Sequence, residues 1–301
     1  MAPTINALME DLTSIGFLDV PVLLEASQPQ PRVPWLWLGA GGCLAMMIVA
    51  GFAGHDGAGA VALQLITSVL SMGIFLALPI LFRLTLRKVR AEQQMLAGVS
   101  ELIHLRRWSE AALAVQQFLS RPARTPQIRA EALVYLASIL ARYHRFDDAI
   151  SLHNYLLENE LVGGTAEYGL KLGRAMAMLR EDHLFDADRA ISDLRRQGPA
   201  DSAGFVLIAI CRDVKTGHPE DALKIFEEKL PMLRDQLGHR VGDAYALAAR
   251  AYDLLDRKAE AADAFKRATL LSPLIELCRR YPEVLKMVGR YEPAAAPAEM
   301  A

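Results

Sequence analysis

The sequence has few of the residues from which catalytic and metal sites are built. Only three cysteines occur in 301 residues, and none stands in a Cys-x-x-Cys or Cys/His spacing suited to zinc. The seven histidines form no His-Glu-x-x-His motif and no pair four residues apart, and no glycine-rich loop is followed by lysine and serine or threonine. No serine stands in a recognisable nucleophile elbow. We therefore expect no metal, no cofactor and no enzyme activity.

An excess of charge of either sign is also lacking. Lysine and arginine number 33 against 35 aspartate and glutamate residues, a formal net charge of −2, so no nucleic-acid partner is expected. The first basic side chain is Arg32, which argues against a cleaved signal peptide in the N-terminal segment, residues 1–33. Within this segment Thr4 can cap an amphipathic helix, which either packs loosely on the protein or lies on a membrane surface.

Two long stretches contain no charged residue at all. The first runs from Val33 to Gly54 and the second from Gly57 to Phe82. Each is about as long as a helix that crosses a hydrocarbon core, roughly 20 residues. The alternative is a pair of buried helices in a soluble domain, but such helices rarely lack a polar face over this length. The sequence therefore predicts transmembrane helices over residues 34–54 and 61–82.

Basic side chains predict the orientation of these helices. Arg83, Arg87, Lys88 and Arg90 directly follow the second stretch, whereas the connection between the two stretches contains no lysine or arginine. The positive-inside rule then places both termini in the cytoplasm. We expect an integral membrane protein with two spans, of the kind found in a bacterial inner membrane.

From Arg87 onward the apolar pattern is helical. Its clearest part consists of two short helices separated by Asp256 and Arg257, with apolar positions three and four residues apart. Small alanines on both helices allow a close approach, so the pattern predicts a helical hairpin. The residues that carry the pattern are Tyr245, Ala248, Ala249, Tyr252, Ala261, Phe265, Ala268 and Pro273.

This order of large, small, aromatic and proline positions resembles the tetratricopeptide repeat (TPR) family. The resemblance implies an all-α protein, with a two-helix transmembrane hairpin followed by a TPR-like α-solenoid of about five helix pairs. We expect the solenoid, with C-terminal capping helices, to cover residues 87–292 and residues 293–301 to form a disordered tail.

Equivalent alanines mark the predicted pairs. Their spacings of 38, 38, 35 and 39 residues exceed the family's period of about 34. Two departures from the pattern are expected, a turn from Glu181 to His183 that is two residues too long and Asp213 at a position that is normally large and apolar. The alanines are Ala111, Ala149, Ala187, Ala222 and Ala261.

The resemblance also implies that the first helix of each pair lines a concave groove for partner peptides. Three arginines on one curved surface could hold a carboxylate-rich segment of a protein partner. The alternative is that these arginines are solvated or pair with nearby acids such as Glu167 and Asp253. The side chains expected to face the groove are Ser138, Arg142, Arg174, Met178, Cys211, Arg250 and Leu254.

The sequence thus predicts a membrane-anchored TPR adaptor or scaffold, which binds and tethers partner proteins at the cytoplasmic face of a lipid bilayer. The alternative is an accessory or regulatory subunit of a membrane enzyme or transporter. Uncharged polar side chains on one face of the second stretch, which could contact another helix, suggest this alternative. They are Gln64, Thr67, Ser68 and Ser71.

Overall fold

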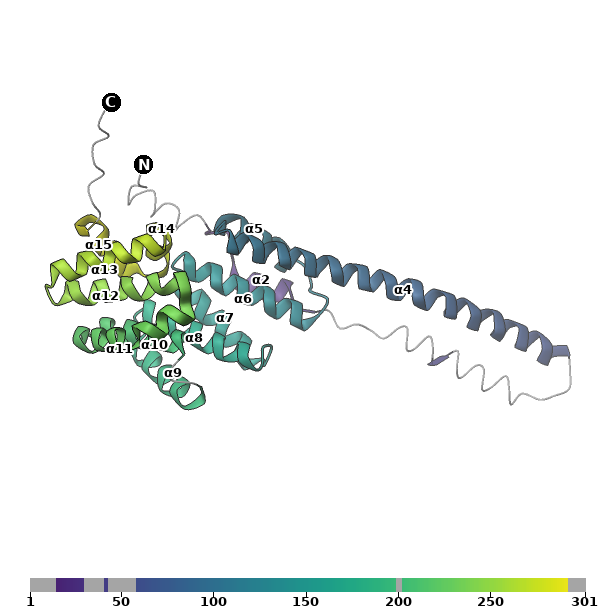
Figure 1. The fold of residues 1–301 in the computed structure, drawn as a ribbon. Helices are drawn as coiled ribbons and strands as arrows, with labels where there is room; N and C mark the ends of the chain where they lie inside the picture. The colour runs from purple at the N-terminus through teal and green to yellow at the C-terminus, as the bar shows by residue number, and fades with distance from the viewer. Residues whose placement is uncertain (1–14, 30–40, 43–57, 199–201, 292–301) are drawn as a thin grey trace, which may run out of the picture.

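The computed structural model describes residues 15–29, 41–42, 58–198 and 202–291. Within these ranges every regular element is helical and no strand occurs, which confirms the all-α class (Figure 1). After a short N-terminal helix, α2 (Val20–Ala26), a long helix α4 (Ala58–His104) leads into a stack of helical hairpins. The helices of the stack are α5 (Trp108–Leu119), α6 (Pro126–Arg142), α7 (Phe146–Glu158), α8 (Thr165–Arg180), α9 (Leu184–Gln197), α10 (Ala203–Lys215), α11 (Pro219–Leu237), the 3-10 helix η1 (Gly238–Val241), α12 (Gly242–Leu254) and α13 (Lys258–Leu271).

The same three-residue turn joins the two helices of each hairpin, α4–α5, α6–α7, α8–α9, α10–α11 and α12–α13. The middle residue of each turn has a positive φ, and the next residue donates its backbone N–H to the carbonyl five residues earlier, as in a Schellman motif. The middle residues are Arg106, His144, Asp182, Gly217 and Asp256. They lie 38, 38, 35 and 39 residues apart, the spacings of the alanines, so the five hairpins are equivalent units.

The turn from Glu181 to His183 is therefore not longer than the others, and that expectation is wrong. Helix α8 continues to Arg180, with Leu179 fully buried, so the residues counted as turn belong to the helix. All five marker alanines are fully buried at the contact between the two helices of a hairpin. Close packing of short side chains therefore holds each hairpin together.

The buried apolar residues form two clusters along the stack. One cluster contains residues of α2, the end of α4 and α5 to α8, and the other contains residues from α8 to the C-terminal helices. The first helices touch within two groups of hairpins, since α4 contacts α6, and α10 contacts both α8 and α12, whereas the second and third hairpins meet through α7 and α8. We call the face formed by these first helices the inner face.

Residues 15–29 belong to the core of the stack. Ile15, Leu18 and Leu23 are buried in the first cluster. The guanidinium of Arg145 donates hydrogen bonds to the carbonyls of Ile15 and Leu18, and Arg129 donates to the carbonyl of Leu24. This part of the predicted N-terminal segment is thus anchored to the hairpins by packing and hydrogen bonds. The predicted helix at Thr4 lies outside the described residues.

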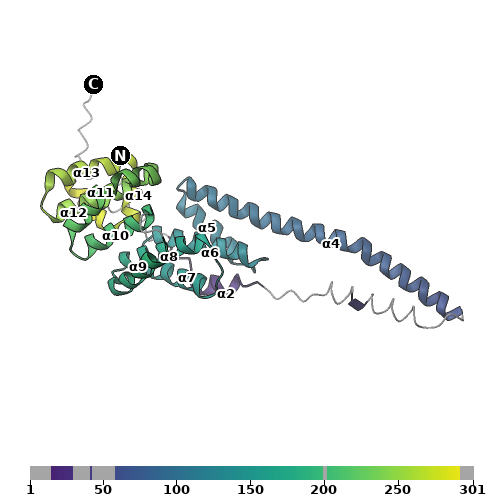
Figure 2. The same ribbon diagram turned by 60° about the horizontal axis from the view of Figure 1, so that its bottom comes forward.

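The second predicted span, residues 61–82, lies in α4, a single helix of 47 residues and about 70 Å. This helix projects from the stack as a rod (Figures 1 and 2). It continues without a break through Arg83, Arg87 and Lys88 to the hairpin residues Leu96 and Val99, which are buried. The uncharged stretch at residues 61–82 is therefore part of a longer helix and not a separate structural element.

In the part of the chain that the structure describes, no helix combines the length and the apolarity that crossing a membrane requires. The prediction of an integral membrane protein with two spans and two cytoplasmic termini is accordingly wrong. It rested on the length of two uncharged stretches and on the basic residues that follow the second one, and α4 joins that second stretch to a charged, partly packed half in one continuous helix. The first predicted span, residues 34–54, lies outside the described residues except for positions 41 and 42.

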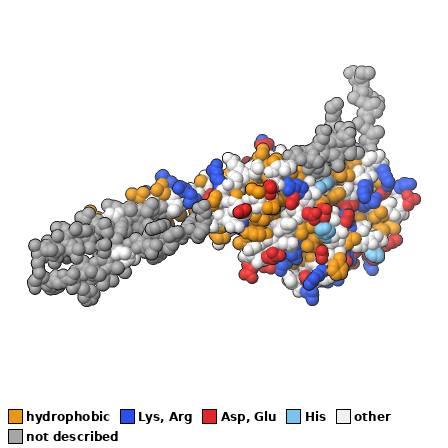
Figure 3. Space-filling model, turned by 180° about the vertical axis from the view of Figure 1, so that it is seen from behind, with side chains coloured by type: hydrophobic (Ala, Val, Ile, Leu, Met, Phe, Trp, Pro, Cys, Tyr) orange, Lys and Arg blue, Asp and Glu red, His pale blue; other side chains and the backbone are white. Residues whose placement is uncertain are grey.

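The surface of the stack carries both signs of charge. Blue lysine and arginine side chains and red aspartate and glutamate side chains are interspersed over the face seen in Figure 3. This agrees with the balanced composition, and specific recognition on this protein must come from local groups of side chains.

Candidate functional site

The C-terminal helices α14 (Leu274–Arg280) and α15 (Pro282–Tyr291), with Tyr281 between them, lie along the inner face. We call residues 274–291 the strap. Helix α15 packs on α12 and α13, as expected of a cap, but α14 reaches α6. The strap therefore does more than close the open end of the stack.

Polar contacts join the strap to the first, second and fourth hairpins. Trp108 Nε1 donates a hydrogen bond of 2.9 Å to Glu276 Oε1. His144 Nε2 lies 3.1 Å from the carbonyl oxygen of Cys278, and Lys215 Nζ forms an ion pair of 2.8 Å with Glu283.

The third and fifth hairpins also contact the strap. The guanidinium of Arg180 lies 5.1 Å from the centre of the Tyr281 ring. Arg280 donates to Asp243, and the Tyr291 hydroxyl donates to Asp253 at 2.8 Å. All five hairpins thus contact one segment of 18 residues.

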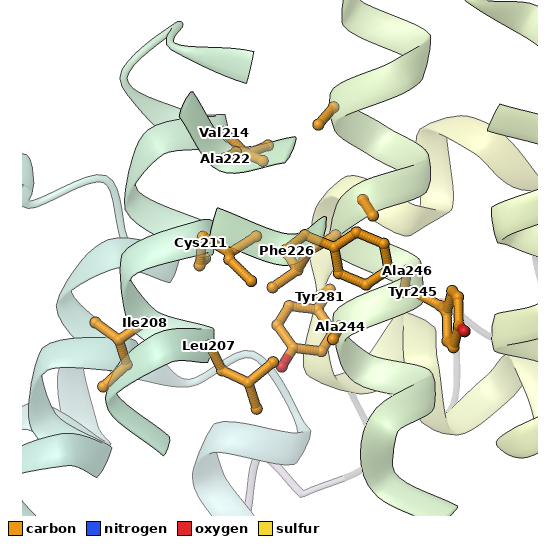
Figure 4. Packing of buried hydrophobic residues seen from close by; sticks show 14 of the residues in the cluster. Leu207, Ile208, Cys211, Val214, Ala222, Phe226, Ala244, Tyr245, Ala246 and Tyr281 are labelled. Atoms are coloured by element: carbon orange, nitrogen blue, oxygen red, sulfur yellow. The ribbon is translucent and has the colours of Figure 1, made fainter. Parts of the chain in front are cut away.

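Tyr281 is the buried centre of the strap. Its side chain lies between Leu207 and Cys211 of α10 and Ala244 of α12 (Figure 4). It is 2 % exposed, and burial raises the pKa of its hydroxyl above the ordinary value. A neutral, apolar contact therefore fixes the middle of the strap, and charged contacts fix its two sides.

A cavity of about 300 Å³ lies between the strap and the inner face. Four arginines line it: Arg142 and Arg180, which end α6 and α8, Arg280, which ends α14, and Arg240 of η1. Asp243, already bonded to Arg280, is the one acid among the described residues that line this space. We call it the arginine cavity.

The arginines of this cavity have more donors than acceptors. Among the described residues, buried nitrogens of three guanidinium groups have no hydrogen-bond acceptor, namely Arg142 Nη1, Arg180 Nε and Arg280 Nε. Burial, followed by the charges of Arg280 and Arg180, lowers the pKa of Arg142 to about 9. The guanidinium of Arg142 lies 5.0 Å from the centre of the Trp108 ring, which fixes its position. The cavity is thus a preformed cationic site.

The residues predicted to face one groove are spread over several places. Ser138 and Arg142 line the arginine cavity. Arg174 donates a hydrogen bond of 3.1 Å to Asn154, and Met178 packs against the second cluster. Cys211 is buried in that cluster, and burial raises its thiol pKa to about 12.

The last two predicted groove residues lie at a second hollow. Arg250 and Leu254 line a space of about 420 Å³ together with Lys215 and Lys286. Arg250 is paired with Asp253, the acid named as its alternative partner. The three predicted arginines therefore do not meet at one point, and Arg142 is the one that lies in a cluster of arginines.

Three arginines of the cavity were missed by the sequence reasoning. Arg180 follows Arg142 by 38 residues, the spacing of their hairpins, so the repeat contained the signal. The positions chosen in that hairpin were Arg174 and Met178, which are two residues early. Neither Arg240, which lies in η1, nor Arg280, which lies in the strap, belongs to a first helix, and the position of Arg280 depends on how the strap folds back.

Comparison of the chain with protein-family models, with curated proteins and with solved structures found no match. The fold itself defines a class of protein, an all-α stack of equivalent helical hairpins with a strap on its inner face. Membership of the TPR family stays a prediction from the sequence pattern. Among the described residues, no group of histidine, cysteine, aspartate and glutamate side chains is placed to hold a metal ion.

Proposed function

We propose that this chain is a TPR-type adaptor without a catalytic step of its own, which binds a short helical segment of a protein partner on its inner face. The observation that supports this proposal is the strap. The inner face already holds a helical segment of this chain through contacts from every hairpin. Grooves that accept an amphipathic helix in this way are a recurring mode of peptide recognition.

The strap indicates the chemistry of the partner segment. Its acids Glu276 and Glu283 are seven residues apart and meet Trp108 and Lys215 of the stack. Between them Leu277 and Tyr281 are buried. A segment with two acids about two helical turns apart and an apolar or aromatic residue between them would reproduce these contacts. This agrees with the acidic partner segment expected from the sequence.

The strap also determines when a partner can bind. Because it is covalently attached, its effective concentration at the inner face is on the order of millimolar. A free segment of similar affinity at micromolar concentration therefore does not displace it. Binding in trans requires a tighter partner or a weakened strap.

A peptide of residues 272–291 with a fluorescent label tests the proposal. We expect the full chain to bind it weakly and the variant E276A/E283A to bind it at least tenfold more tightly, because the variant weakens the strap and leaves the inner face intact. The matched control E220A/E228A removes two acids from the exposed side of α11 and should behave as the unchanged chain. Fluorescence anisotropy measures the binding.

A scrambled peptide should not bind to any of these chains. If the folded E276A/E283A chain, checked by circular dichroism, binds the native and scrambled peptides alike, the inner face does not recognise such segments. The proposed function is then wrong.

A further inference from the structure

The arginine cavity contains more positive charge than its surroundings neutralise. Of the nearby acids, Glu283 is paired with Lys215, and Glu276 contacts both Arg279 and Arg280. Asp243 and Glu276 are therefore the acids that face the four lining arginines and Arg279. The C-terminal ends of α6, α8 and α14 each contribute a partial negative charge of about one half. Together these groups leave between one and two positive charges uncompensated.

The geometry of the donors also calls for an acceptor. Buried nitrogens of Arg142, Arg180 and Arg280, from three different helices, have no acceptor among the described residues. Native proteins rarely leave such groups unsatisfied, and the cost is larger for a charged donor than for a neutral one. The cavity's volume of about 300 Å³ is at the lower end of the range for small-molecule sites.

The guanidinium groups are held in place without an anion. Arg142 stacks on Trp108, Arg180 lies over the rings of Tyr281 and Phe146, and Arg280 is bonded to Asp243. Such groups do not have to be reorganised when a ligand arrives, and planar guanidinium groups match the oxygens of phosphate and carboxylate. Arg240, exposed at the mouth, adds a cation that an entering anion meets first.

A purely structural role of these arginines is the main alternative. In that case the cluster would be expected to contain acids in matching number, as at Arg250 with Asp253 in the neighbouring hollow. Burial is the main reason why the pKa of Arg142 is lowered, and the charges of Arg280 and Arg180 add to this effect against the opposing charges of Glu276 and Asp243. Mutual repulsion in an empty cluster favours a bound counter-charge.

We propose that the arginine cavity binds a small dianion whose oxygens belong to phosphate or carboxylate groups. The oxygens accept hydrogen bonds from Arg142, Arg180 and Arg280, and Arg240 closes the mouth. The site includes one arginine of the strap, so the bound anion connects the strap to the inner face. The proposal does not require a protein partner, and its test contains no peptide.

The test uses the full chain and measures its Tm while inorganic phosphate or malonate is added at constant pH and ionic strength, with chloride as the balancing ion. We expect a saturable rise in Tm that fits one site. A tighter phosphate curve would identify a phosphate ligand, and a tighter malonate curve a dicarboxylate.

Variants localise the effect. R142Q should weaken the apparent anion affinity at least tenfold, and R240Q, which changes an exposed residue and leaves the core intact, should weaken it severalfold. The matched control R189Q changes an exposed arginine of α9 and should retain the affinity of the unchanged chain. If R142Q does not fold, R240Q and R142K still decide the matter, because R142K keeps the charge and loses the planar fork of donors.

The proposal is overturned if neither anion raises Tm beyond the chloride baseline. It is equally overturned if R240Q and R189Q give the same curve as the unchanged chain, since the anion would then bind elsewhere.

Discussion

His153 stands where the repeat pattern has an aromatic side chain. It is 8 % exposed and lies beside Gly173, where an added Cβ would be 3.1 Å from its Nε2 atom. Burial, followed by the charge of Arg174, lowers its pKa from 6.5 to about 4. At neutral pH the ring is therefore uncharged, and it serves as a large, nearly apolar side chain. This explains how a histidine can replace an aromatic residue in the repeat.

Protonation of His153 should destabilise the fold in acid. Between pH 6.5 and about 4 the unfolded chain binds a proton at this residue and the folded chain does not, so stability falls as pH falls through this range. The loss should approach about 3 kcal/mol. Urea unfolding at several pH values measures it, and H153Q should reduce the slope. An equal slope in H153Q and the unchanged chain would contradict this explanation.

Asp213 is the second residue that departs from the repeat pattern. It is 3 % exposed, and its Oδ1 atom accepts a hydrogen bond of 2.8 Å from Arg212 Nε. A neighbour in sequence therefore satisfies the buried carboxylate, and the hairpin keeps its shape. The apolar repeat pattern correctly identified this hairpin, because a single buried acid that is paired with its neighbour leaves the helical spacing of the other apolar residues unchanged.

The register of the hairpins can be tested at Ala149, which is fully buried between α6 and α7. A149W should overpack this contact and lower the free energy of unfolding by about 1–3 kcal/mol or more. A166W, at an exposed position of α8, should change it by less than about 0.5 kcal/mol. Thermal melting followed by circular dichroism compares the two. Equal melting temperatures would mean that the register is wrong.

At the scale of elements, the hairpin turns show which parts of the fold a sequence can predict. Alanine spacing and helical periodicity are local signals, and they identified the five hairpins and their order. The turn residues with positive φ were not identified, because four of them are Arg106, His144, Asp182 and Asp256 and only one is glycine. A Schellman turn accepts these residues at a cost in strain.

This strain predicts that glycine at a hairpin turn stabilises the chain and that alanine in place of a turn glycine destabilises it. D256G should stabilise the chain by about 0.5 kcal/mol, because relief of left-handed strain, about 1–2 kcal/mol, exceeds the added entropy of the unfolded chain, about 0.4–1 kcal/mol. G217A, at the equivalent turn with φ +79°, should destabilise it by about 1 kcal/mol. Chemical denaturation gives both values. Changes of the same sign in the two variants would rule out equivalent turns.

Long elements were predicted less well than hairpins. Helix α4 combines an uncharged half with a hairpin half, and the sequence reasoning divided it where the charges begin, at Arg83. The N-terminal residues Ile15 to Ser27 pack on α5 and accept hydrogen bonds from Arg129 of α6 and from Arg145 of the turn before α7, and these hydrogen bonds join residues about 100 or more apart in the chain. Periodicity within a short window contains no information on such pairs.

For the whole molecule, the strap was the feature least visible in the sequence. Its helices were expected, but Glu276 meets Trp108 across 168 residues and His144 meets Cys278 across 134. The same folding back brings Arg280 to Arg142 and creates the candidate anion site. A site assembled from distant helix ends follows from the packing of the whole chain, and a repeat pattern alone predicted only Ser138 and Arg142 of it.

The strap also connects the two buried clusters, and this connection can be measured. Leu277, Tyr281 and Val284 pack in the C-terminal cluster, whereas Glu276 binds Trp108 of the N-terminal cluster. E276A removes a buried acceptor and the partner of Arg279, at a cost of about 3 kcal/mol. In a stack where each hairpin touches mainly its neighbours, the loss of such a connection should let the two ends unfold separately.

Trp108 reports on this separation, because replacing the two other tryptophans by W35F/W37F leaves it as the sole indole. In that background, thermal unfolding followed by Trp108 emission should coincide with unfolding followed by far-ultraviolet circular dichroism. With E276A added, the emission transition should occur several degrees earlier, since the N-terminal hairpins lose their connection to the strap. E220A, at an exposed acid of α11, should leave the two transitions together. Coincident transitions in the E276A chain would show that contacts between neighbouring hairpins alone make the stack cooperative, and that the strap lies on the inner face without holding its two ends together.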